Sequence, residues 1–183
     1  RFGCQVVGVD INKGVVEQAN ENFKDAGLDH LLSAKVANAL NLPYEDESFD
    51  VVVNEAMLTM MDNKAKERLI TEYKRVLKPG GRLLTHDVSL LENDEEVVDT
   101  LRDTINANVT PLSPSGWRDL FSSLGFSVDQ KVGPMTLMSP KGLIYDEGLS
   151  GALKIIRNGV KAENREQFMK MANFFNKNQD KLG

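Results

Sequence analysis

Residues 49–86 read FDVVVNEAMLTMMDNKAKERLITEYKRVLKPGGRLLTH, and this stretch decides the fold class. The run 49–53 is short, apolar and rich in valine, which predicts a strand buried on both faces. Apolar residues recur at helical spacing over 63–77 and predict an amphipathic helix. Pro79-Gly80-Gly81 breaks this helix, and residues 82–86 predict a second strand. Two strands joined by one helix make a parallel pair, the unit from which α/β sheets are built.

The same alternation of strands and helices continues on both sides of this stretch. Residues 5–9 predict a strand that ends at Asp10, and a helix follows from about Asn12, a good N-cap, to Gly27. Further strands are expected near 33–37 and 126–132, and further helices over 97–105 and 113–125. The sequence therefore predicts an α/β protein with a doubly wound, mostly parallel sheet and helices on both faces.

The C-terminal part, from about residue 136, has helical spacing only. It carries two apolar stripes that we expect to pack in a core; the alternative is that they line a ligand site. They are Leu149, Leu153, Ile156 and Val160, followed by Phe168, Met171, Ala172 and Phe175.

Composition and charge limit the classes of partner. The chain has 183 residues, of which 41% are hydrophobic and 27% charged, typical of one globular domain. Its net charge of −5 shows no excess of basic residues that would favour binding to nucleic acid or an anionic membrane. The single cysteine, Cys4, excludes an internal disulfide and suits a reducing cytoplasm. Apolar runs fall short of a membrane span, and no Cys/His cluster indicates a metal site. We therefore expect a cytoplasmic protein; its oligomeric state stays open.

Asp10 is the first residue that indicates a cofactor. At the carboxyl end of a strand in such a sheet, a carboxylate can accept hydrogen bonds from both hydroxyls of a ribose. This geometry suits NAD and S-adenosylmethionine alike. The alternative is a surface charge that the dipole of the following helix stabilises.

Two further segments distinguish between these cofactors. Residues 37–52, ANALNLPYEDESFDVV, resemble the D-A-x-x-L-P-F-x-x-x-S-F-D-x-V stretch of class I S-adenosylmethionine-dependent methyltransferases. Residues 75–83, RVLKPGGRL, resemble the R-x-L-K-P-G-G-x-L block of the same family, at the expected spacing. The resemblance is strong over about residues 5 to 90 and follows the family plan to about 133. It implies a Rossmann-like fold, methyl transfer and S-adenosylmethionine as cofactor.

The resemblance also implies which residues contact the cofactor. Asp10 would hold the ribose hydroxyls, and Ile11 would pack on the adenine. Asn38 stands where the family usually has aspartate, and its amide oxygen can accept from the adenine amine without the charge. The backbone amide of Ala39 would meet an adenine ring nitrogen, and Leu40 would close the apolar side.

The catalytic candidates lie at the ends of the two strands predicted within residues 49–86. Asn54 would lie near the methionine moiety and the transferred methyl group; alternatively it is a polar strand end that caps the next turn. Methyl transfer depends mainly on positioning and desolvation, but an acceptor that must lose a proton benefits from a general base. His86 and Asp87 are candidates for this base, and Glu55 is a third. The alternative for each is a strand-end polar residue that bonds a nearby loop.

The family's first strand and glycine-rich loop are expected to be missing from this chain, because only nine residues precede Asp10. That strand lies at the centre of the family's sheet, and its loss would leave two rows of backbone groups unpaired. We therefore expect residues 1–183 to be part of a longer protein, or another segment or chain to complete the sheet.

We divide the chain into a partial methyltransferase core, 1–135, and a helical insertion or lid, 136–183, that precedes the final strand. A small organic acceptor is the expected substrate class. Four methionines are candidates to line its pocket, against the alternative of simple packing: Met135, Met138, Met169 and Met171.

Two rival functions fit the fold class. An NAD-dependent oxidoreductase would need a Tyr-x-x-x-Lys pair or a second catalytic domain, but Leu77 stands four residues after Tyr73, where the lysine belongs. A non-catalytic fold relative that serves as a binding module is the other alternative. Retention of Asp10 and Ala39, together with the near-equivalent Asn38, argues against decay of the cofactor site.

Overall fold

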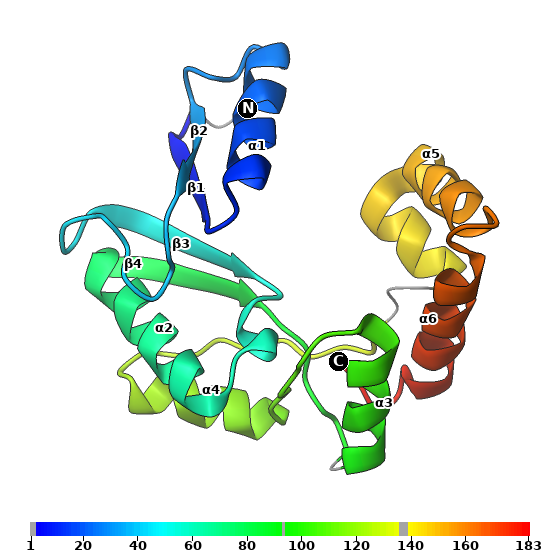
Figure 1. Cartoon of the computed structure of the whole chain (residues 1–183). Coiled ribbons are helices and arrows are strands. Elements are labelled where there is room, and N and C mark those ends of the chain that lie inside the picture. Colours follow the sequence, from blue (N-terminus) through cyan, green and yellow to red (C-terminus); the bar gives the residue numbers. More distant parts are fainter. Residues whose placement is uncertain (1–2, 93, 136–138) are drawn as a thin grey trace. The chain divides into compact units, whose positions relative to one another are not determined.

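The structure is a computed structural model that describes residues 3–92, 94–135 and 139–183. The strands are β1 (Val6–Asp10), β2 (Leu32–Val36), β3 (Phe49–Glu55) and β4 (Leu77–His86). The helices are α1 (Lys13–Asp25), α2 (Asn63–Val76), α3 (Glu95–Ile105), α4 (Pro114–Ser123), α5 (Pro140–Gly159) and α6 (Arg165–Asn178), with a short 3-10 turn, η1 (Leu58–Met60). Figure 1 shows their order along the chain. The first compact unit comprises the described residues through Val53 and Arg68–Leu84, and the second comprises Asn54–Glu67 and those from Thr85 onward.

The first unit opens with a βαβ motif. Strands β1 and β2 pair in parallel, in a register that runs from Val6 opposite Leu32 to Asp10 opposite Val36. Helix α1 packs against both strands. It begins where the Asn12 side chain accepts hydrogen bonds from two backbone amides of the first turn, and it is followed by Gly27 at φ +65°. The elements expected from residues 5–37 are therefore confirmed.

The second βαβ motif consists of β3, α2 and β4, and Figure 1 shows that the two strands run parallel. The apolar stripe of α2 is buried as expected, and its members belong to the first unit: Leu69, Ile70, Tyr73 and Val76, followed by Leu77. Gly81 allows a close backbone approach, since a Cβ there would lie 2.9 Å from the carbonyl oxygen of Lys78 and 3.1 Å from that of Asp50. The α/β Rossmann-like fold class is confirmed.

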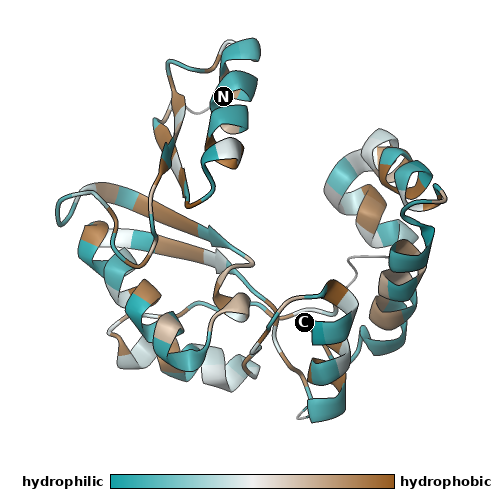
Figure 2. Cartoon of the chain, viewed as in Figure 1, coloured by the Kyte–Doolittle hydropathy of each residue, from teal (hydrophilic) through white to brown (hydrophobic). Residues whose placement is uncertain are grey.

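Two details of this motif differ from the expectation. Pro79-Gly80-Gly81 does not separate α2 from a strand at 82–86, because β4 already begins at Leu77 and includes the three residues. Strand β3 is not buried on both faces, since Val51 is 46% and Val53 69% exposed. Figure 2 shows hydrophobic residues along both β3 and β4. Apolar composition alone does not bury a strand, because burial requires neighbouring strands and covering helices.

The strands form two sheets of two strands, β1–β2 and β3–β4, within the described residues. In the family's sheet, as expected from the resemblance, the first strand lies at the centre. Without that strand, the sheet would contain these same two pairs. In the described residues, one edge of β1 and one edge of β3 therefore have no strand partner.

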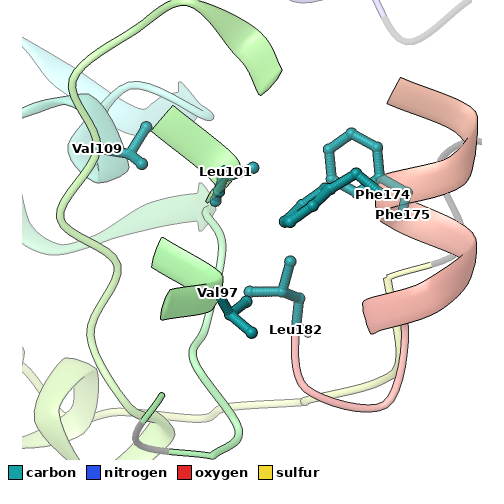
Figure 3. Packing of buried hydrophobic residues seen from close by; sticks show 6 residues of the cluster. All are labelled: Val97, Leu101, Val109, Phe174, Phe175 and Leu182. Carbon is teal, nitrogen blue, oxygen red and sulfur yellow. The ribbon is translucent and has the colours of Figure 1, made fainter. Parts of the chain in front are cut away.

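The second unit is largely helical, and it contains a cluster of buried apolar side chains from α3, the loop after α3, α6 and the residues after α6. Figure 3 shows its members: Val97, Leu101, Val109, Phe174, Phe175 and Leu182. Helix α6 contacts both α3 and α5. Ser89 and Gly183 exchange backbone hydrogen bonds, and Leu182 bridges Leu90 in antiparallel fashion.

Two expectations for the second unit are wrong, and one alternative left open for its methionines is decided in part. Residues 126–132 are not a strand, because they form no ladder with any described segment. The stripe on α5 is not packed in a core, since Leu149, Leu153 and Val160 are all exposed. Of the four candidate methionines, Met135 and Met171 follow the alternative of simple packing, against the apolar cluster of Figure 3; Met169 is exposed, and Met138 lies outside the described residues. The stripe on α6 is buried in part, with Phe175 in the cluster.

Candidate functional site

The carboxyl edge of β1 and β2, in the first unit, brings the predicted adenosine contacts together. The backbone amide of Ala37 donates to the carbonyl oxygen of Asp10 (3.0 Å), so the segment after β2 starts beside the end of β1. The Asp10 side chain is exposed and accepts from the amide of Asn12 (2.7 Å) through Oδ1. The next side chain, Ile11, is 74% exposed. A carboxylate oxygen and an apolar side chain therefore lie open at this edge, as an adenosine would require.

A tight turn follows β2. The Asn38 side-chain oxygen accepts from the amide of Leu40 (2.9 Å), and the Asn38 carbonyl accepts from the amide of Asn41 (3.0 Å). Ala39, between them, is buried. The turn occupies one acceptor site of the Asn38 oxygen, and an amide oxygen has two.

Three charged side chains fix the loop that follows this turn, and we call Arg75, Glu72 and Asp46 the loop clamp. The Arg75 guanidinium forms a bidentate ion pair with the Glu72 carboxylate (2.7 and 3.0 Å) and donates a further hydrogen bond to the Asp46 carboxylate (2.7 Å). It also donates to the carbonyls of Leu42 (3.2 Å) and Tyr44 (2.9 Å), while Glu72 accepts from the amide of Leu42 (2.7 Å). Hydrogen bonding to Arg75 lowers the pKa of Glu72, and hydrogen bonding to Glu72 raises that of Arg75.

The sequence interpretation missed the clamp role of Glu72. A signal was present, because Glu72 and Arg75 are three residues apart on one helix face, where opposite charges pair. The clamp ties the predicted adenine loop to α2, so the sequence block that begins at Arg75 has a structural function in the first unit.

In the second unit, the carboxyl ends of β3 and β4 bring Glu55 and His86 into contact. The imidazole Nδ1 lies 2.7 Å from a Glu55 carboxylate oxygen, and the two side chains are 84% and 70% exposed. The backbone also joins here, since the amide of Ala56 donates to the carbonyl of His86 (2.7 Å). Ala56 has φ +51°, a left-handed conformation that costs energy for a residue with a Cβ. We call this pair the His86–Glu55 dyad.

Asp87, the residue that follows His86, accepts four hydrogen bonds, two on each carboxylate oxygen. One oxygen accepts from the amide and the hydroxyl of Thr59 (2.8 and 3.0 Å). The other accepts from the Asn54 amide group (3.0 Å) and the Thr85 hydroxyl (2.5 Å). Asn54 is buried and also contacts Thr85 (3.2 Å). We call these four residues the Asp87 network.

One charged side chain that the sequence interpretation did not single out is fully buried in this unit. The Lys66 ammonium donates to the carbonyls of Met61 (2.6 Å) and Thr110 (2.8 Å) and to the Thr110 hydroxyl (2.5 Å). It lies 5.6 Å from the centroid of the Trp117 ring. Burial lowers the pKa of Lys66 to about 8, against the opposing effects of Asp87 and Asp62. A lone lysine in a helical stretch gives no sequence signal of such burial.

The predicted site residues thus fall into two groups. Asp10, Ile11, Asn38, Ala39 and Leu40 belong to the first unit, and Asn54, Glu55, His86 and Asp87 to the second. Helices of sufficient length and apolar character to cross a membrane do not occur in the described part of the chain.

Comparison with known proteins supports the cofactor interpretation. Residues 1–85 match the family described as "Methyltransferase domain". A protein of Haemophilus influenzae without assigned function is 52% identical over the whole chain, which covers 73% of that protein. The sarcosine/dimethylglycine N-methyltransferase of Halorhodospira halochloris is 28% identical over 69% of this chain. Among solved structures, the MccD protein aligns with a TM-score of 0.73 at 23% identity, over 98% of this chain and 76% of its own.

The extent of these matches differs between relatives. The chain spans most of the Haemophilus protein but only 44% of the N-methyltransferase. The likeness to MccD, at 23% identity, establishes the fold alone.

Proposed function

Because the chain belongs to the class I S-adenosylmethionine-dependent methyltransferases, we propose that the protein transfers a methyl group to a small organic acceptor, with His86 as general base. The assignment of His86 as the general base rests on its contact with Glu55 at the ends of two adjacent strands. A base at this edge suits an oxygen or nitrogen nucleophile that must lose a proton.

The first unit provides residues that fit the adenosine of S-adenosylmethionine. Asp10 offers a carboxylate oxygen that the described residues leave without a donor, since Asn12 contacts only the other oxygen. We propose that Asp10 binds the ribose hydroxyls, that exposed Ile11 covers the adenine, and that the 38–40 turn contacts its edge. The cofactor's sulfonium, when bound, supplies an activated methyl group.

The three acid–base candidates have different surroundings. Asp87 already accepts four protein hydrogen bonds, so we assign it to positioning rather than proton transfer. Glu55 contacts Nδ1 of His86 and therefore favours the tautomer that carries its proton there. This arrangement leaves Nε2 as the acceptor, on a side chain that is 84% exposed. Asn54 is committed to the Asp87 network, so we propose that it too positions the strand ends.

A small molecule is the acceptor class that the available observations favour. The net charge of −5 gives no support for a nucleic acid, and the relative from Halorhodospira halochloris is named for sarcosine and dimethylglycine, both small amines. A cytoplasmic location, expected from the single cysteine, stays part of this proposal.

Calorimetric titration with S-adenosylhomocysteine tests the cofactor site. Asp10→Asn keeps an oxygen for the Asn12 amide but removes the charge and one acceptor. Loss of a hydrogen bond to a charged group is worth about 1.5–3 kcal/mol, so we expect Kd to rise about 10- to 100-fold. Asp29→Asn, an exposed aspartate of the same unit, is the matched control and should bind like wild type. Equal affinities for wild type and Asp10→Asn would contradict the assignment.

Methyl transfer from labelled S-adenosylmethionine to a panel of small amines and alcohols tests the base. We expect His86→Gln to lower kcat about 10²–10⁴-fold, the usual contribution of a general base. Glu55→Gln should have a smaller effect, since it removes only the orienting charge. Both variants should bind S-adenosylhomocysteine normally. If His86→Gln retained full kcat on an acceptor turned over by wild type, the base assignment would fail while the cofactor assignment stood.

A further inference from the structure

Lys66 is the buried charged group that the proposed mechanism does not use. Lysine is almost never fully buried unless its ammonium is paired, and here it is fully buried with four oxygen partners: the Met61 carbonyl, the Thr110 carbonyl and hydroxyl, and the Asn63 side chain (3.3 Å). Such a group is costly to bury, so the arrangement calls for a function other than filling space.

The Lys66 ammonium joins two segments that are distant in sequence. Met61 follows η1, and Thr110 lies in the loop between α3 and α4. The Thr110 hydroxyl in turn donates to the Met61 carbonyl (2.5 Å), and the Thr110 amide donates to the carbonyl of Thr59 (2.8 Å). Lys66 and Thr110 therefore hold η1 against the 106–112 loop.

The segment held in this way supports the ends of β3 and β4. Thr59, in η1, donates twice to Asp87, and its hydroxyl accepts from the amide of Val88 (3.0 Å). Asp87 accepts from Asn54 and Thr85, the residues immediately before Glu55 and His86. A continuous path of hydrogen bonds thus leads from Lys66 to the neighbours of the dyad.

The dyad cannot hold this arrangement by itself. A contact between two exposed polar side chains contributes little to stability, and both members are mostly exposed. We infer that Lys66 is a positioning residue for the His86–Glu55 dyad. It acts through Thr59 and the Asp87 network, which set the backbone from which both side chains project. This inference rests on the role of the dyad in the proposed function.

The tautomer of His86 provides a direct readout, because the chain has two histidines, His30 and His86. In the full chain labelled with ¹⁵N-histidine, nitrogen chemical shifts show which ring nitrogen carries the proton of the neutral imidazole. His30→Gln assigns the signals. Wild type should populate the Nδ1-protonated form, and Glu55→Gln should lose it.

Two pairs of variants test Lys66. Lys66→Met removes the ammonium, and Lys64→Met is its matched control, an exposed lysine on the same helix. Thr110→Val removes the hydroxyl that joins Lys66 to Met61, and Thr110→Ser restores it. We expect Lys66→Met and Thr110→Val to reduce the Nδ1-protonated fraction of His86 several-fold, and Lys64→Met and Thr110→Ser to leave it unchanged.

The outcomes separate a positioning role from a merely structural one. If Lys66→Met or Thr110→Val lowers the melting temperature but keeps the wild-type tautomer, the inference is overturned. Should Lys66→Met fail to fold, the Thr110→Val and Thr110→Ser pair decides the question. The tautomer is measured without an acceptor, so a failure of the proposed base role in kinetics would remain distinguishable from a failure of this inference.

Discussion

The pH dependence of stability should reveal the buried state of Lys66. Burial lowers its pKa to about 8, whereas lysine in the unfolded chain titrates near its ordinary value of 10.5. Between these two values the unfolded chain binds a proton that the folded protein does not. The free energy of unfolding therefore rises with pH across this window.

The size of this rise follows from the difference between the two pKa values. Each pKa unit corresponds to about 1.4 kcal/mol, so the difference amounts to about 3 kcal/mol of added stability from about pH 8 to 10.5. Below about pH 8 both states bind the proton, and this group adds no slope. Asp87 and Asp62 raise the pKa of Lys66 and so oppose burial, which means that a weaker burial effect would shrink the rise.

Urea unfolding of wild type and Lys66→Met at a series of pH values measures the effect. Contributions of all other groups are shared by the two proteins and cancel in the difference between them. That difference should change by about 3 kcal/mol across the window. Lys64→Met should instead run parallel to wild type, because Lys64 is exposed. Parallel curves for wild type and Lys66→Met would refute the reasoning.

Three further substitutions give sharp expectations. Arg75→Gln removes the centre of the loop clamp, so calorimetry should show several-fold weaker binding of S-adenosylhomocysteine. Unchanged affinity would mean that cofactor binding does not depend on the clamp. Gly81→Ala places a Cβ within 3.1 Å of the Lys78 and Asp50 carbonyls, so chemical denaturation should show a loss of about 1–3 kcal/mol, and a neutral result would mean that the backbone yields there. Leu101→Ala opens a cavity in the cluster of Figure 3 and should cost about 2–5 kcal/mol in the same assay; a loss well below this range would indicate that the helices collapse into the space.

The local sequence pattern was sufficient for most elements of secondary structure. Asn12 begins a helix where side-chain capping predicts, and Gly27 follows the helix that it was expected to end. The helix expected over 113–125 is α4, which Ser113 caps. Capping and helical spacing act over a few residues, so one sequence contains the necessary information. The family resemblance likewise located Asp10 and the 38–40 turn, which the structure brings to one edge of β1 and β2.

Several motif residues have roles that only the fold reveals. Asp50 and Lys78, from the two family segments, form an ion pair (2.8 Å), and hydrogen bonding from Lys78 lowers the pKa of Asp50. Arg75, which begins the second segment, closes the loop clamp. Lys78 and Asp50 are 28 residues apart, and Arg75 and Asp46 are 29 residues apart, so spacing alone could not pair them.

The sequence by itself determined the family, the alternation of strands and helices, and the residue types at the strand ends. The tertiary structure alone decided what is buried and what is paired: β3 is partly exposed despite its valines, 126–132 forms no strand, and Lys66 is buried despite its charge. The physical reason is that burial and strand pairing depend on segments far away in the chain, whereas a propensity depends on near neighbours. For the same reason, the sequence proposed three candidate bases, and only the hydrogen bonds distinguish the exposed His86–Glu55 dyad from the fully bonded Asp87.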